Sequence, residues 1–174
     1  VLDTSGRPML AEEEVKETAA GFRKAADFVR ETKVAADVAI HFTSLNWNMF
    51  EQQGIVKGLN YQQSVVGRLY KPLIDLGLRP DVIDAHAALD GYRVVFSPLM
   101  LTLEEAGLPQ RMEQWVREGG TWIVGPLSDE RNRDGARYTD CLYGMLERLM
   151  GVEWKYALPD TEGRTAAAWT DGTP

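Results

Sequence analysis

The segment from Tyr92 to Pro126 constrains the fold most, because it has the pattern of a strand, a helix and a second strand in close succession. Tyr92–Leu99 (YRVVFSPL) and Thr121–Pro126 (TWIVGP) are short apolar runs typical of buried strands. Thr102–Glu118 lies between them with the spacing of an amphipathic helix, and Gly119-Gly120 ends that helix. Such a unit is a right-handed crossover between two parallel strands, which predicts an α/β fold.

The remaining elements alternate in the same way. We predict further strands at Asp37–Thr43, Pro80–His86 and Val152–Leu158, helices at Ala11–Thr32, Tyr61–Leu76 and Arg137–Met150, and loops at Ser44–Asn60 and Leu127–Ala136. Pro72 lies inside a predicted helix and should kink it or end it early. Alternation of strands and helices predicts a three-layer sandwich, in which helices cover both faces of a parallel sheet of the flavodoxin-like kind.

Charge and composition exclude several classes of partner. The net charge of −7 disfavours binding to nucleic acid or to an anionic membrane, and no apolar run approaches the length of a membrane helix. The single cysteine cannot form an internal disulfide, and we expect a cytoplasmic protein. The chain starts at Val1 rather than Met, and we expect both ends to be cuts in a longer polypeptide.

A cofactor site would lie beyond the carboxyl ends of the strands. The segment after the first strand offers Thr43, Ser44 and Asn46 as hydrogen-bond donors, but no glycine occurs before Gly54. A phosphate cradle needs glycines that let backbone N–H groups approach the phosphate. We therefore predict no cofactor, and a flavodoxin-like flavin site remains the weaker alternative.

The nucleophiles and bases of the chain do not form a catalytic pattern. Cys141, the only thiol, lies inside a predicted helix instead of on a strand-to-helix turn, so we interpret it as an inert packed cysteine. His41 lies within the first strand and is interpreted as structural. Asp84 and His86 share one face of the second strand and could act as acid and base, although no third partner is evident. We predict no catalytic residue and no metal site.

An apolar cluster in the predicted loop Ser44–Asn60 suggests a contact surface. Trp47, Met49 and Phe50 are large apolar residues in a connection that should lie on the surface. Such residues are enriched in the cores of protein interfaces, which makes these three the candidate subunit contact. The alternative, that this loop folds back over its own core, is equally open at this point.

Four stretches of the chain resemble the middle domain of the family 42 glycoside hydrolases, the β-galactosidases, which is known as the trimerization domain. The stretches are VAIHFTSLNW, YKPLIDLGLRPDVI, LDGYRVVFSPLMLTLEEAGLPQRMEQWVREGGTWIVGP and a charged loop with Asp129-Glu130. The resemblance implies an α/β domain at residues 36–158, whose fold is also similar to that of class I glutamine amidotransferases. Residues 1–35 resemble the last loop and helix of a preceding catalytic barrel. Residues 159–174 are interpreted as a tail that leads to a further domain.

The resemblance also implies a function. The barrel of that family supplies both catalytic glutamates, so a chain without it is expected to be a non-catalytic assembly domain of an enzyme that hydrolyses terminal β-galactosides. Its partners would be the other subunits of a homotrimer, and galactosides would bind through the barrel. The alternative is an autonomous small-molecule enzyme of flavodoxin-like or amidotransferase-like fold, although the turn Gly125-Pro126-Leu127 carries no nucleophile.

Overall fold

The computed structural model describes residues 2–155, which divide into two compact units at Ala35. The first unit, residues 2–35, contains a turn closed by the Asp3 carboxylate and the long helix α1 (Glu12–Val29). The predicted helix at Ala11–Thr32 is thus confirmed, with slightly narrower bounds. None of the α1 residues is buried, and the side chains of Val15 and Phe22 are exposed.

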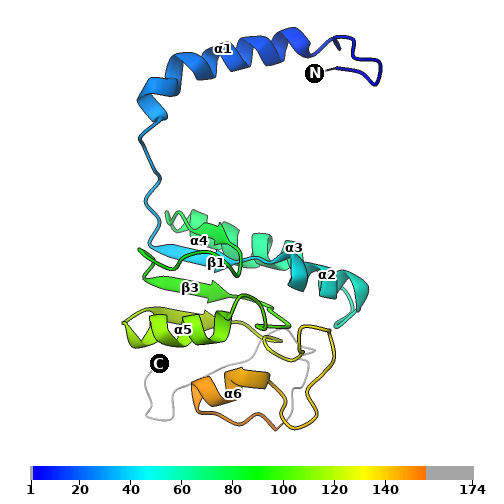
Figure 1. Cartoon of the computed structure of the whole chain (residues 1–174), viewed down its shortest axis with the longest axis vertical. Helices are drawn as coiled ribbons and strands as arrows, with labels where there is room; N and C mark the ends of the chain where they lie inside the picture. Colours follow the sequence, from blue (N-terminus) through cyan, green and yellow to red (C-terminus); the bar gives the residue numbers. More distant parts are fainter. Residues whose placement is uncertain (1, 156–174) are drawn as a thin grey trace. The chain divides into compact units, whose positions relative to one another are not determined.

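The second unit, from residue 36 onward, is built on a four-stranded parallel sheet (Figure 1). Its strands are β1 (Val38–His41), β2 (Asp81–Ile83), β3 (Val94–Ser97) and β4 (Thr121–Val124), arranged in the order β2-β1-β3-β4. All pairs are parallel, as predicted, and each strand is shorter than its predicted span. β3 and β4 are neighbours joined by one helix, which confirms the predicted crossover unit.

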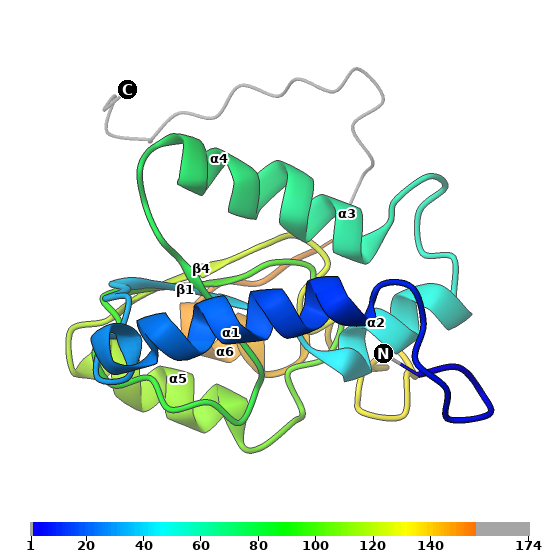
Figure 2. The same cartoon turned by 90° about the horizontal axis from the view of Figure 1, so that it is seen from above.

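Helices cover both faces of this sheet (Figure 2). The first layer holds α2 (Ser44–Gln52), α3 (Tyr61–Val65), the π-helical segment η1 (Val66–Tyr70) and α4 (Lys71–Asp75). The second layer holds α5 (Leu108–Arg117) and α6 (Gly144–Met150). Among residues 2–155, no helix combines the length and the apolar character needed to cross a bilayer.

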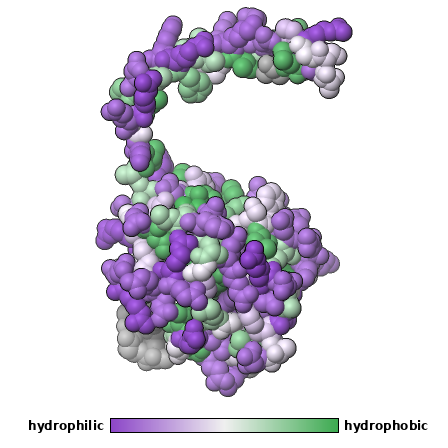
Figure 3. All heavy atoms as spheres, in the orientation of Figure 1, coloured by the Kyte–Doolittle hydropathy of each residue, from purple (hydrophilic) through white to green (hydrophobic). Residues whose placement is uncertain are grey.

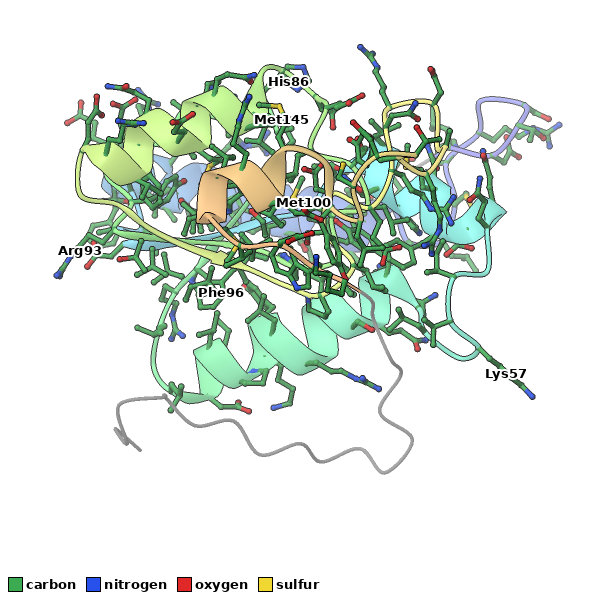
Figure 4. The ribbon with its side chains drawn as sticks, turned by 90° about the horizontal axis from the view of Figure 1, so that it is seen from below. Lys57, His86, Arg93, Phe96, Met100 and Met145 are labelled. Atoms are coloured by element: carbon green, nitrogen blue, oxygen red, sulfur yellow. The ribbon has the colours of Figure 1, made fainter. Side chains whose placement is uncertain are left out.

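Each face of the sheet has its own hydrophobic core, because side chains alternate along the strands. Ile40 packs with Tyr61 and Leu73 on the α2–α4 side, and Figure 4 shows Phe96 on this same side. Ala39 and Val95 instead pack with Leu108 and Met112 beneath α5. This division confirms the predicted three-layer sandwich.

Pro72 does not end its helix early, which was one of the two predicted outcomes. Residues Tyr61–Asp75 form one helical run, but the turn before Pro72 widens into η1. Proline has no N–H to donate to the preceding turn, and a π-bulge accommodates the missing hydrogen bond.

Four predictions about single elements were wrong, the last of them for the part of the element that the structure describes. Ser44–Asn60 is not a long loop, because Thr43 caps an α2 helix at its start. The helix predicted from Thr102 begins only at Leu108, after Ala106 and Gly107 adopt left-handed backbone angles. The helix predicted over Arg137–Met150 is restricted to α6. Of the predicted strand Val152–Leu158, Val152–Lys155 is not a strand, and the rest lies outside the described residues.

Candidate functional site

A chain of polar side chains joins the ends of β1 and β3 to the middle of β4. The Nδ1 atom of His41 lies 2.8 Å from the Ser97 hydroxyl, which also accepts a 2.7 Å hydrogen bond from the Trp122 indole. Burial and the nearby Arg111 guanidinium lower the pKa of His41 to about 4, so its ring is neutral at pH 7. The Nε2 atom of His41 is buried and finds no partner among the described residues. This arrangement joins β1, β3 and β4, in agreement with the structural role predicted for His41.

The polar groups that could have held a phosphate instead connect α2 to the segment after β3. The Thr43 hydroxyl accepts hydrogen bonds from the backbone N–H of Asn46, at 3.2 Å, and from its side-chain amide, at 2.8 Å. The Asn46 amide also donates to the Thr102 carbonyl and accepts from the Thr102 N–H. Both side chains are buried and make these contacts inside the domain, which is a structural role and not that of an open ligand site.

The segment after β4 carries a buried carboxylate, Asp129, which the sequence pattern showed only as part of a charged loop. Asp129 is almost fully buried and adopts a positive φ of 60°. It accepts hydrogen bonds from the Leu146 N–H, at 2.9 Å, and from the Tyr138 hydroxyl, at 3.2 Å. Burial raises the pKa of Asp129, and these hydrogen bonds oppose the rise. Asp129 therefore fixes the start of α6 against the loop of residues 128–138.

Tyr138 and Glu130 complete this cluster. The Tyr138 hydroxyl also lies 3.1 Å from a Glu104 carboxylate oxygen and 3.2 Å from the Arg131 carbonyl. Glu130 is buried and pairs with Arg137 at 3.2 Å. In the sequence, Asp129 and Glu130 belong to the predicted loop Leu127–Ala136, and nothing within that loop marks them as buried. The aromatic residue Tyr138, which follows this loop in the sequence, was the one indication that these carboxylates could be buried.

Neither candidate for acid–base or nucleophilic chemistry is arranged for it. Cys141 precedes α6 instead of lying inside it, because the Glu147 carboxylate accepts the N–H groups of Leu142 and Tyr143 and so sets the start of the helix. Burial and the neighbouring Asp140 raise the pKa of the Cys141 thiol, which keeps it protonated and weakly nucleophilic.

Asp84 and His86 form a turn instead of a catalytic pair. β2 ends at Ile83, and the Asp84 carboxylate accepts the His86 backbone N–H at 2.7 Å. The side chains of both residues are about two-thirds exposed, and Figure 4 shows His86 near the outer side of the α5 layer. In the part of the chain that the structure describes, no cluster of three or more His, Cys, Asp or Glu could hold a metal ion.

The three residues predicted as a subunit contact separate into two groups on α2. Met49 and Phe50 are each 8% exposed, and both belong to the core beneath α2–α4, where Phe50 stacks on Tyr61. Trp47 is 37% exposed, lies against Phe42, and its indole donates to the Glu51 carboxylate at 3.3 Å. Of the three, only Trp47 presents a substantial surface to a partner.

Comparison with known proteins places this geometry in a known context. A sequence model of the family described as "Beta-galactosidase trimerisation domain" matches residues 36–171. The β-galactosidase YesZ of Bacillus licheniformis is 29% identical over 163 residues, which cover 93% of this chain and 24% of that protein. The β-galactosidase BglY of Alicyclobacillus acidocaldarius is 33% identical over 146 residues, which cover 82% of this chain and 21% of that protein.

Solved structures agree on the fold. The β-galactosidase of Bacillus circulans sp. alkalophilus superposes with a TM-score of 0.72 at 22% identity, over 94% of this chain and 24% of that one. The β-galactosidase of Bifidobacterium adolescentis superposes with a TM-score of 0.58 at 25% identity, over 69% of this chain and 56% of that one. The chain thus spans about a quarter of the length of the curated relatives named above.

Proposed function

Since this chain belongs to the family of β-galactosidase trimerisation domains, we propose that it is a non-catalytic assembly domain of a β-galactosidase-type glycoside hydrolase. The family match over residues 36–171 carries this proposal. The parent enzyme would hydrolyse terminal β-galactosides through a catalytic barrel that lies outside this chain. The lone Cys141 is compatible with a reducing compartment, and we place the parent in the cytoplasm.

The carboxyl ends of the strands support a non-catalytic role. The buried polar side chains described there tie one segment of the domain to another: His41 and Ser97 join strands, Asn46 joins α2 to Thr102, and Asp129 holds α6. A hydrolase of amidotransferase type would need an activated nucleophile at this edge. The turn after β4 offers Gly125-Pro126-Leu127 instead.

The domain boundaries belong to the same proposal. Residues 1–35 would be the last loop and helix of the barrel, and residues 159–174 would lead to a further domain. The exposed apolar side chains of α1, among them Val15 and Phe22, would pack on the barrel in the parent enzyme.

Trp47 is the proposed contact with a neighbouring subunit, since Met49 and Phe50 contribute to the core. Burying the exposed part of one indole is worth on the order of 1–2 kcal/mol. Trp47→Ala should therefore weaken self-association by about tenfold or more and leave the domain folded. Phe50→Ala is the matched comparison. Because Phe50 packs in the core, its truncation should lower the thermal stability of the domain, which Trp47→Ala should not. A Trp47→Ala variant that unfolds, or that assembles like the wild type, would reject this contact.

An activity assay and a mass measurement test the proposal as a whole. The purified chain should not release the aryl group of an activated aryl β-galactoside, and light scattering should show association of chains. Turnover that is lost on mutating a carboxylate of this chain would contradict the non-catalytic role. A monomer at all concentrations would contradict the assembly role.

A further inference from the structure

The sheet leaves two different edges open within the described residues, one at β2 and one at β4. In parallel ladders, alternate residues direct both backbone groups to the same neighbour. Thr121 and Gly125 donate to β3, so the peptide groups of Trp122 and Val124 point away from the sheet. At the other edge, the Ile83 carbonyl accepts from the N–H of Phe42, the residue that follows β1, so the peptide groups of Val82 point outward.

The β4 edge is flanked by apolar surface on both faces. On the α5 side, a groove of about 330 Å³ is lined by Val116, Trp122 and Met150, among others. On the opposite face, a groove of about 370 Å³ has Ile123 beside Leu69 in its lining. We define the β4-edge patch as Val116, Ile123 and Met150, whose side chains are 41%, 43% and 52% exposed.

The β2 edge carries a second apolar patch. Leu76 ends α4, Leu78 follows in the connection, and Val82 lies in the middle of β2. We define these three residues as the β2-edge patch, and they are 77%, 40% and 55% exposed. By register with Ile40, Val82 faces the α2–α4 side of the sheet. The face of this unit visible in Figure 3 is mostly hydrophilic, with small and scattered hydrophobic areas.

A closed ring of three identical subunits needs two different surfaces, because each contact joins one face of a subunit to another face of the next. A single self-complementary patch would stop at a dimer. The two edge patches are different surfaces at the two ends of the sheet order, so a contact between them is head-to-tail, the kind of contact from which rings are built. Resting on the proposed assembly function, we infer that the β4-edge patch of one copy of this chain binds the β2-edge patch of the next copy.

The contact would depend mainly on side chains. β2 has three residues, and Pro80 at the next outward position has no N–H to donate. An edge with proline and a short strand resists extended backbone pairing. Recognition would thus come from apolar burial across Val82 and Ile123, which substitution of a single side chain can disrupt.

Two single variants and their mixture test the inference. Val82→Lys removes one patch and Ile123→Lys removes the other; each variant alone should associate at least about tenfold more weakly than the wild type. When the two are mixed, Val82→Lys still has an intact β4 edge and Ile123→Lys an intact β2 edge. The mixture should therefore form a one-to-one pair and stop there, as measured by native mass spectrometry and sedimentation.

Controls separate this inference from the proposed function. Val56→Lys, at a side chain 45% exposed in the α2–α3 connection, should assemble like the wild type, and circular dichroism should show all three variants folded. If the wild type assembles and both edge variants still assemble fully, or if the mixture yields no pair, the edge contact is overturned while the assembly function stands. Loss of assembly in Phe22→Lys alone would place the contact on α1 and would also overturn the inference. A monomeric wild type would overturn the assembly function and the edge contact together.

Discussion

His41 should make the folded domain sensitive to acid. Its pKa is lowered from 6.5 to about 4, first by burial and then by the Arg111 charge, and the Asp84 charge opposes this shift. Between pH 6.5 and 4, the unfolded chain binds a proton that the folded chain does not. The contribution of neutral His41 to the free energy of unfolding is therefore fully present above pH 6.5 and is lost as the pH falls toward 4. The difference between the His41 pKa values of the unfolded and folded chains corresponds to about 3 kcal/mol of unfolding free energy.

Urea unfolding of the wild type and of His41→Gln, followed by tryptophan fluorescence at several pH values, would measure this loss. Carboxylates add their own pH dependence to both proteins, so the informative quantity is the difference between the two profiles. We expect His41→Gln to be less stable than the wild type at pH 7, because it lacks the native ring in its cavity. Between pH 7 and 4, its unfolding free energy should fall by about 3 kcal/mol less than that of the wild type. His86→Gln, at an exposed histidine, should follow the wild type. Parallel profiles for the wild type and His41→Gln would refute the reasoning.

Two further stability predictions follow from local geometry. Ala106 and Gly107 precede α5 with φ of 52° and 62°, and neither is buried. Ala106→Gly should therefore raise the unfolding free energy by ~0.5–1 kcal/mol, whereas Gly107→Ala should lower it by ~1 kcal/mol. Thermal melts that rank these two variants in the opposite order would contradict the assigned backbone angles. Tyr138→Phe removes the hydroxyl shared by Asp129 and Glu104 and should cost ~1–2 kcal/mol, with faster hydrogen exchange at the Leu146 amide. An unchanged exchange rate there would mean that Tyr138 does not hold α6.

The sequence pattern was sufficient for the sheet and its layers. Continuous apolar runs such as Val38–Ile40 are typical of strands covered on both faces, and the glycines after α5 end that helix as expected. These features depend on local chemistry and on side-chain period, which a sequence displays directly.

Long-range contacts could not be anticipated in the same way. Asn46 stabilises the start of α2 by pairing with Thr102, 56 positions further along the chain, so the segment had no local helix signal beyond Thr43. Asp129 is buried because α6 and Tyr138 supply its hydrogen bonds, whereas in the sequence it belongs to a charged run. Met49 and Phe50 look like surface residues only as long as α2 is taken for a loop.

Sedimentation equilibrium of the wild-type chain over a wide concentration range tests the central claim most directly. The assembly function predicts a species of three times the 19.5 kDa chain mass that dissociates on dilution. A mass that stays at a single chain at every concentration would contradict the claim.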